Sequence, residues 1–174
     1  EVIVVDDGSD VPNPHATIRL ERSQGYGAAL KAGIRQAKHR YIGTMDGDGQ
    51  HSFKDMERLW EFLNYFPENA MVVGDRRLRE YQPYRWIGRK VLNMIASLFA
   101  GRWISDLNSG MRIFRKDAAV GYEPILANGF SFTTSLALSM MADDYRVDFL
   151  PIRVHPRTVG VTKVKLVKDG WTTL

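Results

Sequence analysis

Two aspartates separated by a single glycine, Asp46 and Asp48, follow the apolar segment 41–45, and Gln50 and Glu57 come soon after them. Carboxylates held so close together repel each other unless a cation lies between them. The spacing is compatible with two kinds of metal site. One is a calcium loop of the EF-hand type, and the other is a site in which a divalent cation bridges the two phosphates of a nucleotide diphosphate.

The calcium-loop interpretation has two weaknesses. With Asp46 as the first loop residue, the sixth position, where the sharp turn requires glycine, is His51. An EF-hand also needs a helix before the loop, whereas residues 40–45 have the pattern of a strand. A nucleotide-diphosphate site suits this context better, because ligands of open α/β sheets bind at the carboxyl ends of strands. Gly47 and Gly49 would let the backbone approach such a ligand closely.

Composition limits the classes of protein to consider. The 174 residues are 44% hydrophobic and include no cysteine, which predicts one well-packed domain spanning residues 1–174, without disulfides or thiolate metal sites. The formal net charge of +4 predicts an anionic partner, such as nucleic acid, a phosphorylated substrate or a membrane surface. No apolar run reaches the roughly 18 residues of a membrane-spanning helix, and no signal-peptide pattern opens the chain.

The hydrophobic pattern alternates between strand and helix along the chain. Strands are predicted at 1–5, 16–21, 40–45, 70–74, 111–116 and 145–155, the first of them as a buried strand. Helices are predicted at 25–39, 52–66, 83–101 and 131–144, the second with Ser52 as its N-cap. This alternation predicts an α/β domain with a mostly parallel central sheet flanked by helices.

Six short motifs occur in a recognisable order: VVDDGS (4–9), GYGAALKAG (25–33), MDGDGQH (45–51), VVGDRR (72–77), DLNSGMRIFRK (106–116) and GFSF (129–132). In this order they resemble the family 2 glycosyltransferases with the GT-A fold, specifically the dolichyl- or polyprenyl-phosphate sugar (mannose or glucose) synthases. The resemblance covers nearly the whole chain. It implies a GT-A-like single domain and an inverting, metal-assisted transfer of a sugar from a UDP- or GDP-sugar to a polyprenyl phosphate.

The same resemblance has implications for the ends of the chain and for its location. Members of the family normally have one more strand and helix before VVDDGS, and they often continue past the region of Leu174 into membrane-associated helices. We therefore expect a chain that lacks its first strand and helix and is incomplete at its C-terminus. The whole protein is expected at the cytoplasmic face of a membrane, and nucleic acid is not expected as a partner.

The resemblance also implies roles for the donor-site residues. The implied nucleotide-sugar-binding residues are Asp6, Asp7, Gly8, Ser9, Gly25, Gly27 and Asp46. An aspartate of the DD pair would accept a hydrogen bond from the base, and the two glycines open a helix whose free N–H groups favour phosphate. Asp46 would lie near the ribose and the metal, with Asp48 and Gln50 as direct or water-mediated ligands. Carboxylate and amide oxygens suit Mg²⁺ or Mn²⁺, which keep several waters and take few protein ligands.

A phosphate acceptor beside a nucleotide diphosphate requires additional positive charge. Arginine is suited to supply it, because its guanidinium can donate hydrogen bonds to two phosphate oxygens at once. At motif positions the chain offers Arg76, Arg89 with Asn93 one turn on, and Arg157 in a loop that ends at Lys163. These three arginines, together with Asp48 and Asp106, form the predicted catalytic set. A phosphate needs no base, so the resemblance implies that Asp106 orients an arginine or the sugar.

Two alternatives stay open from the sequence. In the first, the acceptor is a sugar hydroxyl in polysaccharide synthesis, and Asp106 is the base. The chain could also be a nucleotide- or calcium-binding module without transfer activity. The helix predicted at 83–101, basic in its first half and apolar beyond it, is expected either to contact a membrane surface or to pack in the core.

Overall fold

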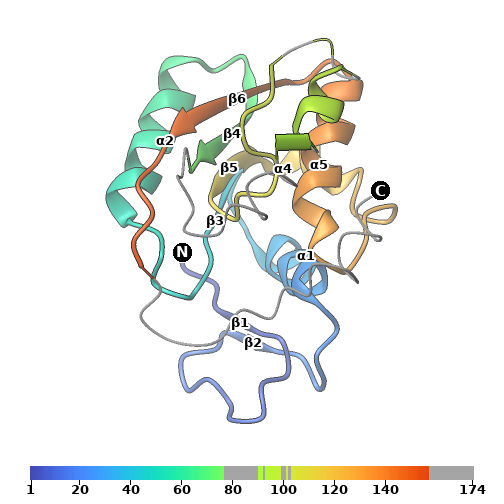
Figure 1. Ribbon diagram of the computed structural model, residues 1–174. Coiled ribbons are helices and arrows are strands. Elements are labelled where there is room, and N and C mark those ends of the chain that lie inside the picture. Colours follow the sequence, from blue (N-terminus) through green and yellow to red (C-terminus); the bar gives the residue numbers. More distant parts are fainter. Residues whose placement is uncertain (77–89, 92, 99–100, 102, 157–174) are drawn as a thin grey trace.

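The computed structural model describes residues 1–76, 90–91, 93–98, 101 and 103–156 (Figure 1). The strands are β1 (Val5–Asp6), β2 (Ile18–Arg19), β3 (Tyr41–Thr44), β4 (Asn69–Asp75), β5 (Arg112–Arg115) and β6 (Arg146–Pro151). The helices are α1 (Tyr26–Gln36), α2 (Phe53–Tyr65), α4 (Lys116–Val120) and α5 (Ser131–Ala142), and residues 93–98 are also helical.

Four strands form the central sheet in the order β3-β5-β4-β6. The pairing of β4 with β6 is parallel, whereas β5 is antiparallel to both β3 and β4. Three strands therefore share one direction, and the predicted mostly parallel sheet needs correction at β5. This reversal matters for the site, because it brings the loop before β5 to the edge of the sheet where β3 and β4 end.

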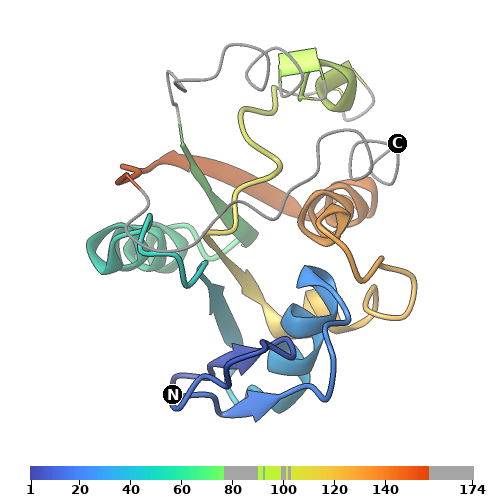
Figure 2. The same cartoon turned by 60° about the horizontal axis from the view of Figure 1, so that its bottom comes forward.

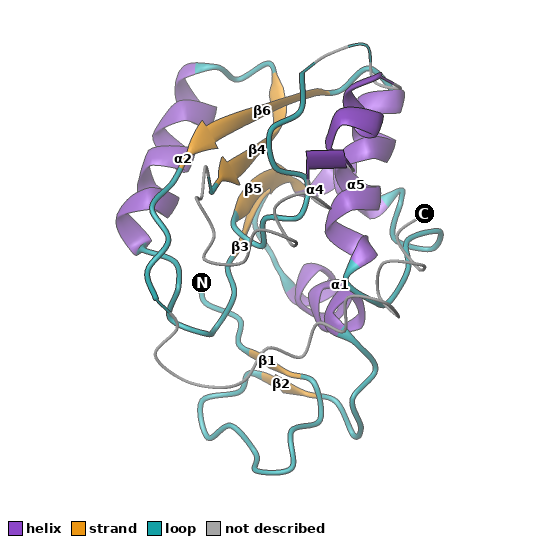
Figure 3. Ribbon diagram, viewed as in Figure 1, coloured by secondary structure: helices purple, strands orange, loops and turns teal. Residues whose placement is uncertain are grey.

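Helices cover both faces of this sheet, α2 on one face and α1, α4 and α5 on the other (Figures 2 and 3). The strand residues alternate between two apolar clusters, as the period of two along a strand requires. Met71 and Val73 belong to the cluster that includes α1 and α5, whereas Val72 belongs to the cluster that includes Leu59 and Leu63 of α2. All five side chains are almost completely buried, so this α/β arrangement is held by apolar contacts on both faces.

The N-terminal segment differs from the expected buried strand. Only Val5 and Asp6 form β1, which pairs in parallel with β2 in a separate two-stranded sheet. Val2 is 82% exposed, and Val4 and Val5 are only partly buried. Among the residues that the structure describes, β1 pairs with β2 alone, so its side chains lack the flanking strands that would bury them.

The start of α2 follows from its sequence. Ser52 has an extended backbone, and its hydroxyl accepts a hydrogen bond from the N–H of Lys54 at 3.2 Å, which confirms the predicted N-cap. Before this helix lies β3, a strand, so the EF-hand interpretation of the acidic run is wrong. Of the helix predicted at 83–101, residues 83–89, 92, 99–100 lie outside the described part.

Candidate functional site

Asp46 lies two residues after β3, between Tyr26 and Gly110. The Tyr26 hydroxyl donates a hydrogen bond of 2.8 Å to Oδ1 of Asp46. On the other side, a Cβ atom added to Gly110 would lie 2.4 Å from both carboxylate oxygens of Asp46. Burial, reinforced by the charge of Asp46, raises the pKa of Tyr26, so the phenol stays protonated and acts as the donor. This carboxylate is therefore held on two sides by α1 and by the loop before β5.

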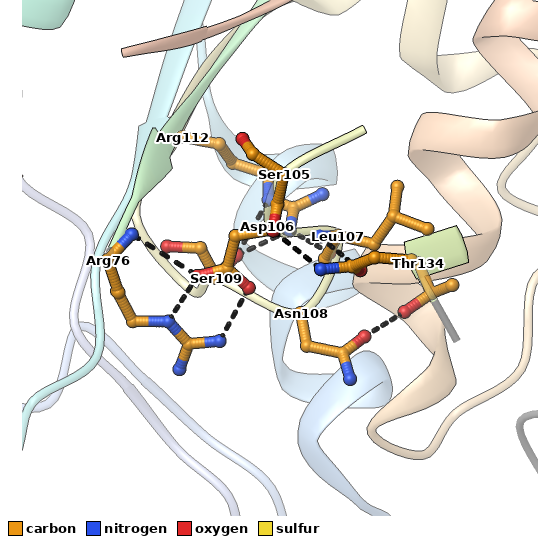
Figure 4. Close-up of polar contacts among 9 residues, drawn as sticks. Arg76, Ser105, Asp106, Leu107, Asn108, Ser109, Arg112 and Thr134 are labelled. Carbon is orange, nitrogen blue, oxygen red and sulfur yellow. Dashed lines mark hydrogen bonds and ion pairs between the residues drawn. The ribbon is translucent and has the colours of Figure 1, made fainter. Parts of the chain in front are cut away.

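Asp106 and Arg76 form an ion pair beside it, at the carboxyl end of β4 (Figure 4). The Arg76 Nε atom donates to Oδ2 of Asp106 at 2.7 Å, and Nη2 donates to Oδ1 at 2.9 Å. The backbone N–H of Arg76 also donates to Oδ2 at 3.3 Å. Such a paired geometry fixes the plane of the guanidinium. Asp106 is only 5% exposed, and it orients Arg76, one of the two roles that the resemblance implied.

Arg112 lies beneath the loop that carries Asp106 and Gly110. It is 1% exposed, and its guanidinium donates to the carbonyl oxygens of Leu107, Ser109 and Thr133. Burial lowers the pKa of Arg112 to about 10, against the opposing influence of Tyr26, Asp106 and Asp46, so the side chain remains charged at neutral pH. Its positive charge lies within range of both site carboxylates and compensates them electrostatically.

The same loop is fastened from two further directions. The Asn93 amide donates to the carbonyl oxygen of Ser105 at 2.5 Å, and its Oδ1 accepts from the N–H of Leu107 at 3.5 Å. On the other side, the Thr134 hydroxyl of α5 is hydrogen-bonded to Asn108 (Figure 4). Asn93 was predicted to bind the acceptor phosphate, whereas the structure shows its side chain joining the helical segment 93–98 to this loop.

Of the three predicted metal ligands, Asp46, Asp48 and Gln50, the last two follow Asp46 in a tight turn. Asp48 accepts a hydrogen bond from the N–H of Gln50 at 3.1 Å, and the Gln50 amide donates to the carbonyl oxygen of His155 at 3.3 Å. His51 lies among the charges of Asp46 and Asp48, yet burial outweighs both carboxylates and lowers its pKa. Its Nδ1 is buried and has no hydrogen-bond partner among the described residues.

These residues fit a metal site that substrate phosphates complete better than a site in which the protein supplies every ligand. Within the described part of the chain, no group of three His, Cys, Asp or Glu side chains is placed to hold a metal ion. Mg²⁺ and Mn²⁺ sites of phosphate-transferring enzymes commonly use only one or two carboxylates, with substrate phosphates and water completing the set. Asp46 and Asp48 are compatible with that donor set.

Both aspartates of the DD pair are engaged with their own chain. Asp6 accepts from the N–H groups of Ser9 and Asn13, and it is ion-paired with Arg19. Hydrogen bonding by Ser9, followed by that of Asn13, keeps the pKa of Asp6 well below its usual range. This buried carboxylate shapes the loop after β1, so base recognition by Asp6 or Asp7 stays a prediction.

The Asp7 carboxylate ties the same loop to the start of α1, accepting from the Ser23 hydroxyl and from the N–H groups of Gln24 and Gly25. Gly8, with a φ of 64°, lies where a Cβ would be 2.4 Å from the carbonyl carbon of Arg22. Glycine is needed there because the two segments touch and the backbone is left-handed.

Gly25 and Gly27 have a packing role in this structure. The N–H groups of Gly27 and Ala28, in the first turn of α1, both donate to the carbonyl oxygen of Asn128. A Cβ on Gly25 would be 2.5 Å from that same oxygen, and one on Gly27 would be 2.5 Å from the Ala127 oxygen. The glycines thus allow the segment before α5 to lie against α1, and their predicted contact with a nucleotide stays a prediction.

Three predicted acceptor residues, Arg89, Arg157 and Lys163, lie outside the described residues. Conversely, the sequence reasoning missed Tyr26, Gly110 and Arg112 as site residues, although all three lie inside the motifs. The signal for Arg112 was a charged residue within the apolar strand MRIFRK, which is unusual unless the charge is paired.

Comparison with known proteins decides the family. The model of the glycosyl transferase family 2 matches residues 1–121. The chain belongs to this family. One relative is the low-salt glycan biosynthesis hexosyltransferase Agl6 of Haloferax volcanii, which is 26% identical to this family 2 chain. The match covers 98% of this chain and 43% of Agl6. The dodecaprenyl-phosphate galacturonate synthase of Rhizobium johnstonii is 27% identical over 94% of this chain and 52% of the relative.

A further relative is the undecaprenyl-phosphate 4-deoxy-4-formamido-L-arabinose transferase of Pectobacterium atrosepticum, 29% identical over 77% of the family 2 chain and 47% of its own length. The chain thus spans about half the length of these curated relatives. Among solved structures, glucosyl-3-phosphoglycerate synthase from Mycobacterium tuberculosis with phosphoglyceric acid superimposes with a TM-score of 0.67. It has 15% identity and covers 91% of this chain and 62% of its own, which confirms the GT-A fold predicted for the chain.

Proposed function

We propose that the protein transfers a sugar from a nucleotide-diphosphate sugar to a polyprenyl phosphate, with inversion at the anomeric carbon, at the cytoplasmic face of a membrane. The observation that carries this proposal is the presence, at one edge of the sheet, of the Asp46 and Asp48 carboxylates and of Arg76, whose guanidinium is ion-paired with Asp106. The polyprenyl-phosphate transferases among the relatives support the choice of acceptor.

The reaction needs one displacement. An oxygen of the acceptor phosphate forms a bond to the anomeric carbon while the bond from that carbon to the nucleoside diphosphate oxygen breaks, and the bonding electron pair leaves with the diphosphate. Arg76 is oriented to offset negative charge where two phosphate-bearing substrates meet, and no covalent intermediate with the protein is needed. Both oxygens of Asp106 accept hydrogen bonds from Arg76, an arrangement that favours orientation over proton abstraction from a hydroxyl acceptor.

The donor diphosphate would share its cation with Asp46 and Asp48, with Gln50 nearby. Mg²⁺ or Mn²⁺ bound there would stabilise the negative charge of the leaving diphosphate. A structure of the M. tuberculosis neighbour contains Mn²⁺ and UDP-glucose, which supports the choice of a divalent ion and a UDP-sugar among the donors to test. This chain's own residues contribute by holding the Asp46 carboxylate between Tyr26 and Gly110.

The proposal is tested by incubating the protein with labelled UDP- and GDP-sugars, MnCl₂ and a polyprenyl phosphate. We expect a labelled lipid product, and we expect Asp48→Asn to lower its rate of formation about tenfold because a ligand charge is lost. Glu57→Gln is the matched control, since Glu57 is exposed on α2 and the calcium-loop alternative would make it the essential ligand. A labelled polymer in place of the lipid, or no product from any donor, would contradict the proposal.

We also propose that the helical segment 93–98, together with Val91 and Trp103, contacts the membrane surface. Exposed apolar residues recur there at helical spacing, with Val91, Met94, Ile95 and Leu98 between 36% and 77% exposed and Trp103 at 81%. Asn93, on the opposite side of the segment, fastens it to the loop of Asp106. An apolar face so close to the ion pair suits the delivery of a lipid phosphate, and the net charge of +4 suits anionic lipid. No described helix is both long and apolar enough to cross the bilayer.

Vesicle flotation tests this surface. Binding to phosphatidylglycerol-containing vesicles should exceed binding to phosphatidylcholine vesicles and should fall as salt is raised, because the charges are screened. The double substitution Met94→Ser with Leu98→Ser should weaken binding several-fold, since both side chains are exposed and their removal leaves the core intact. The matched control is Ile125→Ser, an equally exposed apolar residue in the turn after α4. Equal binding by both variants would refute this surface.

A further inference from the structure

We propose that Tyr26 is a positioning residue of the donor site, whose hydroxyl holds the Asp46 carboxylate in one orientation while Phe130 holds the tyrosine ring. This inference rests on the proposed function, because it assigns Asp46 to donor binding. The family resemblance and the sequence motifs gave Tyr26 no role beyond its place between two glycines.

The first support is the contact itself. The Tyr26 hydroxyl donates to Oδ1 of Asp46 at 2.8 Å, a normal length for a hydrogen bond to a carboxylate. For Oδ2 of the same carboxylate, the described residues supply no hydrogen-bond donor. One oxygen is thus used inside the protein, and the other is left for a ligand.

The second support is the way the ring is held. The rings of Tyr26 and Phe130 stack with centroids 5.4 Å apart and planes 16° from parallel. Tyr26 is the first residue of α1, and the next two N–H groups of that helix donate to the carbonyl oxygen of Asn128. The tyrosine and its stacking partner therefore belong to two segments that are joined at their backbones, so the hydroxyl has little freedom to move.

The third support is the opposite wall. Gly110 leaves no space for even a Cβ beside the Asp46 oxygens, so the carboxylate is enclosed between a backbone surface and a phenol. A carboxylate fixed in this way is pre-organised, and it loses less rotational freedom when it binds.

The test compares two Tyr→Phe substitutions. Tyr26→Phe removes the hydroxyl and keeps the ring that stacks on Phe130. Its matched control is Tyr122→Phe, because Tyr122 also donates to an aspartate, Asp143 at 2.6 Å, but lies after α4 at the opposite end of β5 from Arg112. We expect Tyr26→Phe to raise the KM for the nucleotide sugar and the MnCl₂ concentration for half-maximal activity by roughly three- to tenfold. The KM for polyprenyl phosphate should stay unchanged, and Tyr122→Phe should match the wild type in all three constants.

A double variant separates positioning from general damage. If Tyr26 acts through Asp46, adding Tyr26→Phe to Asp46→Asn should cause little further loss, since the two changes remove the same interaction. Additive losses, or a Tyr26→Phe variant with wild-type constants, would overturn the inference.

A failure of the proposed function can be distinguished from a failure of the positioning role of Tyr26. Wild-type protein that makes no lipid product would refute the polyprenyl-phosphate reaction, yet calorimetric titration with UDP and GDP in MnCl₂ would still report on the donor site. Weaker nucleotide binding by Tyr26→Phe than by Tyr122→Phe would then support the positioning role. Absence of nucleotide binding by the wild type, or equal binding by both variants, would overturn it.

Discussion

Replacing Arg112 by methionine is expected to lower the free energy of unfolding by about 3–5 kcal/mol, the usual cost of removing one member of a buried charged network. The substitution keeps much of the apolar volume but leaves the carbonyl oxygens of Leu107, Ser109 and Thr133 without their donor. Each buried group that loses its partner costs roughly 1–3 kcal/mol. Urea denaturation followed by circular dichroism measures the loss.

Arg115→Met is the matched control for this experiment. Arg115 ends the same strand that Arg112 begins, and it pairs with Asp117 near solvent, with the Asp117 side chain 57% exposed. Solvent-exposed pairs contribute roughly 0–1 kcal/mol, so the control should stay close to the wild type. Similar midpoints for the two variants would show that Arg112 does not hold the loop before β5.

Replacing Gly110 by alanine is expected to reduce sugar transfer about 100-fold, the loss that a displacement of about 1 Å can cause in a site. The added Cβ would lie 2.4 Å from both carboxylate oxygens of Asp46, so this carboxylate must rotate away from Tyr26. The Asp46 side chain is short and can turn aside, so the fold should survive. We therefore expect a small change in melting temperature and a large change in kcat/KM for the nucleotide sugar.

Gly121→Ala serves as the control, because Gly121 lies in the turn after α4 and a Cβ there meets nothing within 4 Å among the atoms around it. Its activity should stay within a few-fold of the wild type. If Gly110→Ala were as active as Gly121→Ala, the carboxylate would not need the position that the structure gives it. If Gly110→Ala unfolded, the comparison of Tyr26→Phe with Tyr122→Phe would test the position of Asp46 instead.

Local patterns determined the elements of this protein. The unbroken apolar run at residues 70–73 predicted β4, and the pleat of a strand sends its successive side chains into two apolar layers. Ser52 marked the start of α2, because a cap acts within two residues of itself. The motif order also led to the family and to Asp46 and Asp48 as candidates, since acidic residues that follow a strand are visible in sequence.

Contacts between distant segments decided the rest. The direction of β5 depends on its pairing with β3 and β4, and its antiparallel course brings Asp106 and Gly110 to the edge where Asp46 and Arg76 lie. Sequence periodicity is the same for a strand in either direction, so it carries no information about this choice.

The sequence likewise did not predict which groups bind the aspartate side chains. Asp6 and Asp46 come at or just after strands, and Asp106 lies in the loop before β5. The carboxylate of Asp6 is held by backbone N–H groups and Arg19, that of Asp46 by the Tyr26 hydroxyl, and that of Asp106 by the Arg76 guanidinium. The partners of Asp46 and Asp106 lie 20 and 30 residues away. Which donors reach a carboxylate depends on how the whole chain packs, and therefore only the tertiary structure separates the loop-shaping aspartate from the two at the site.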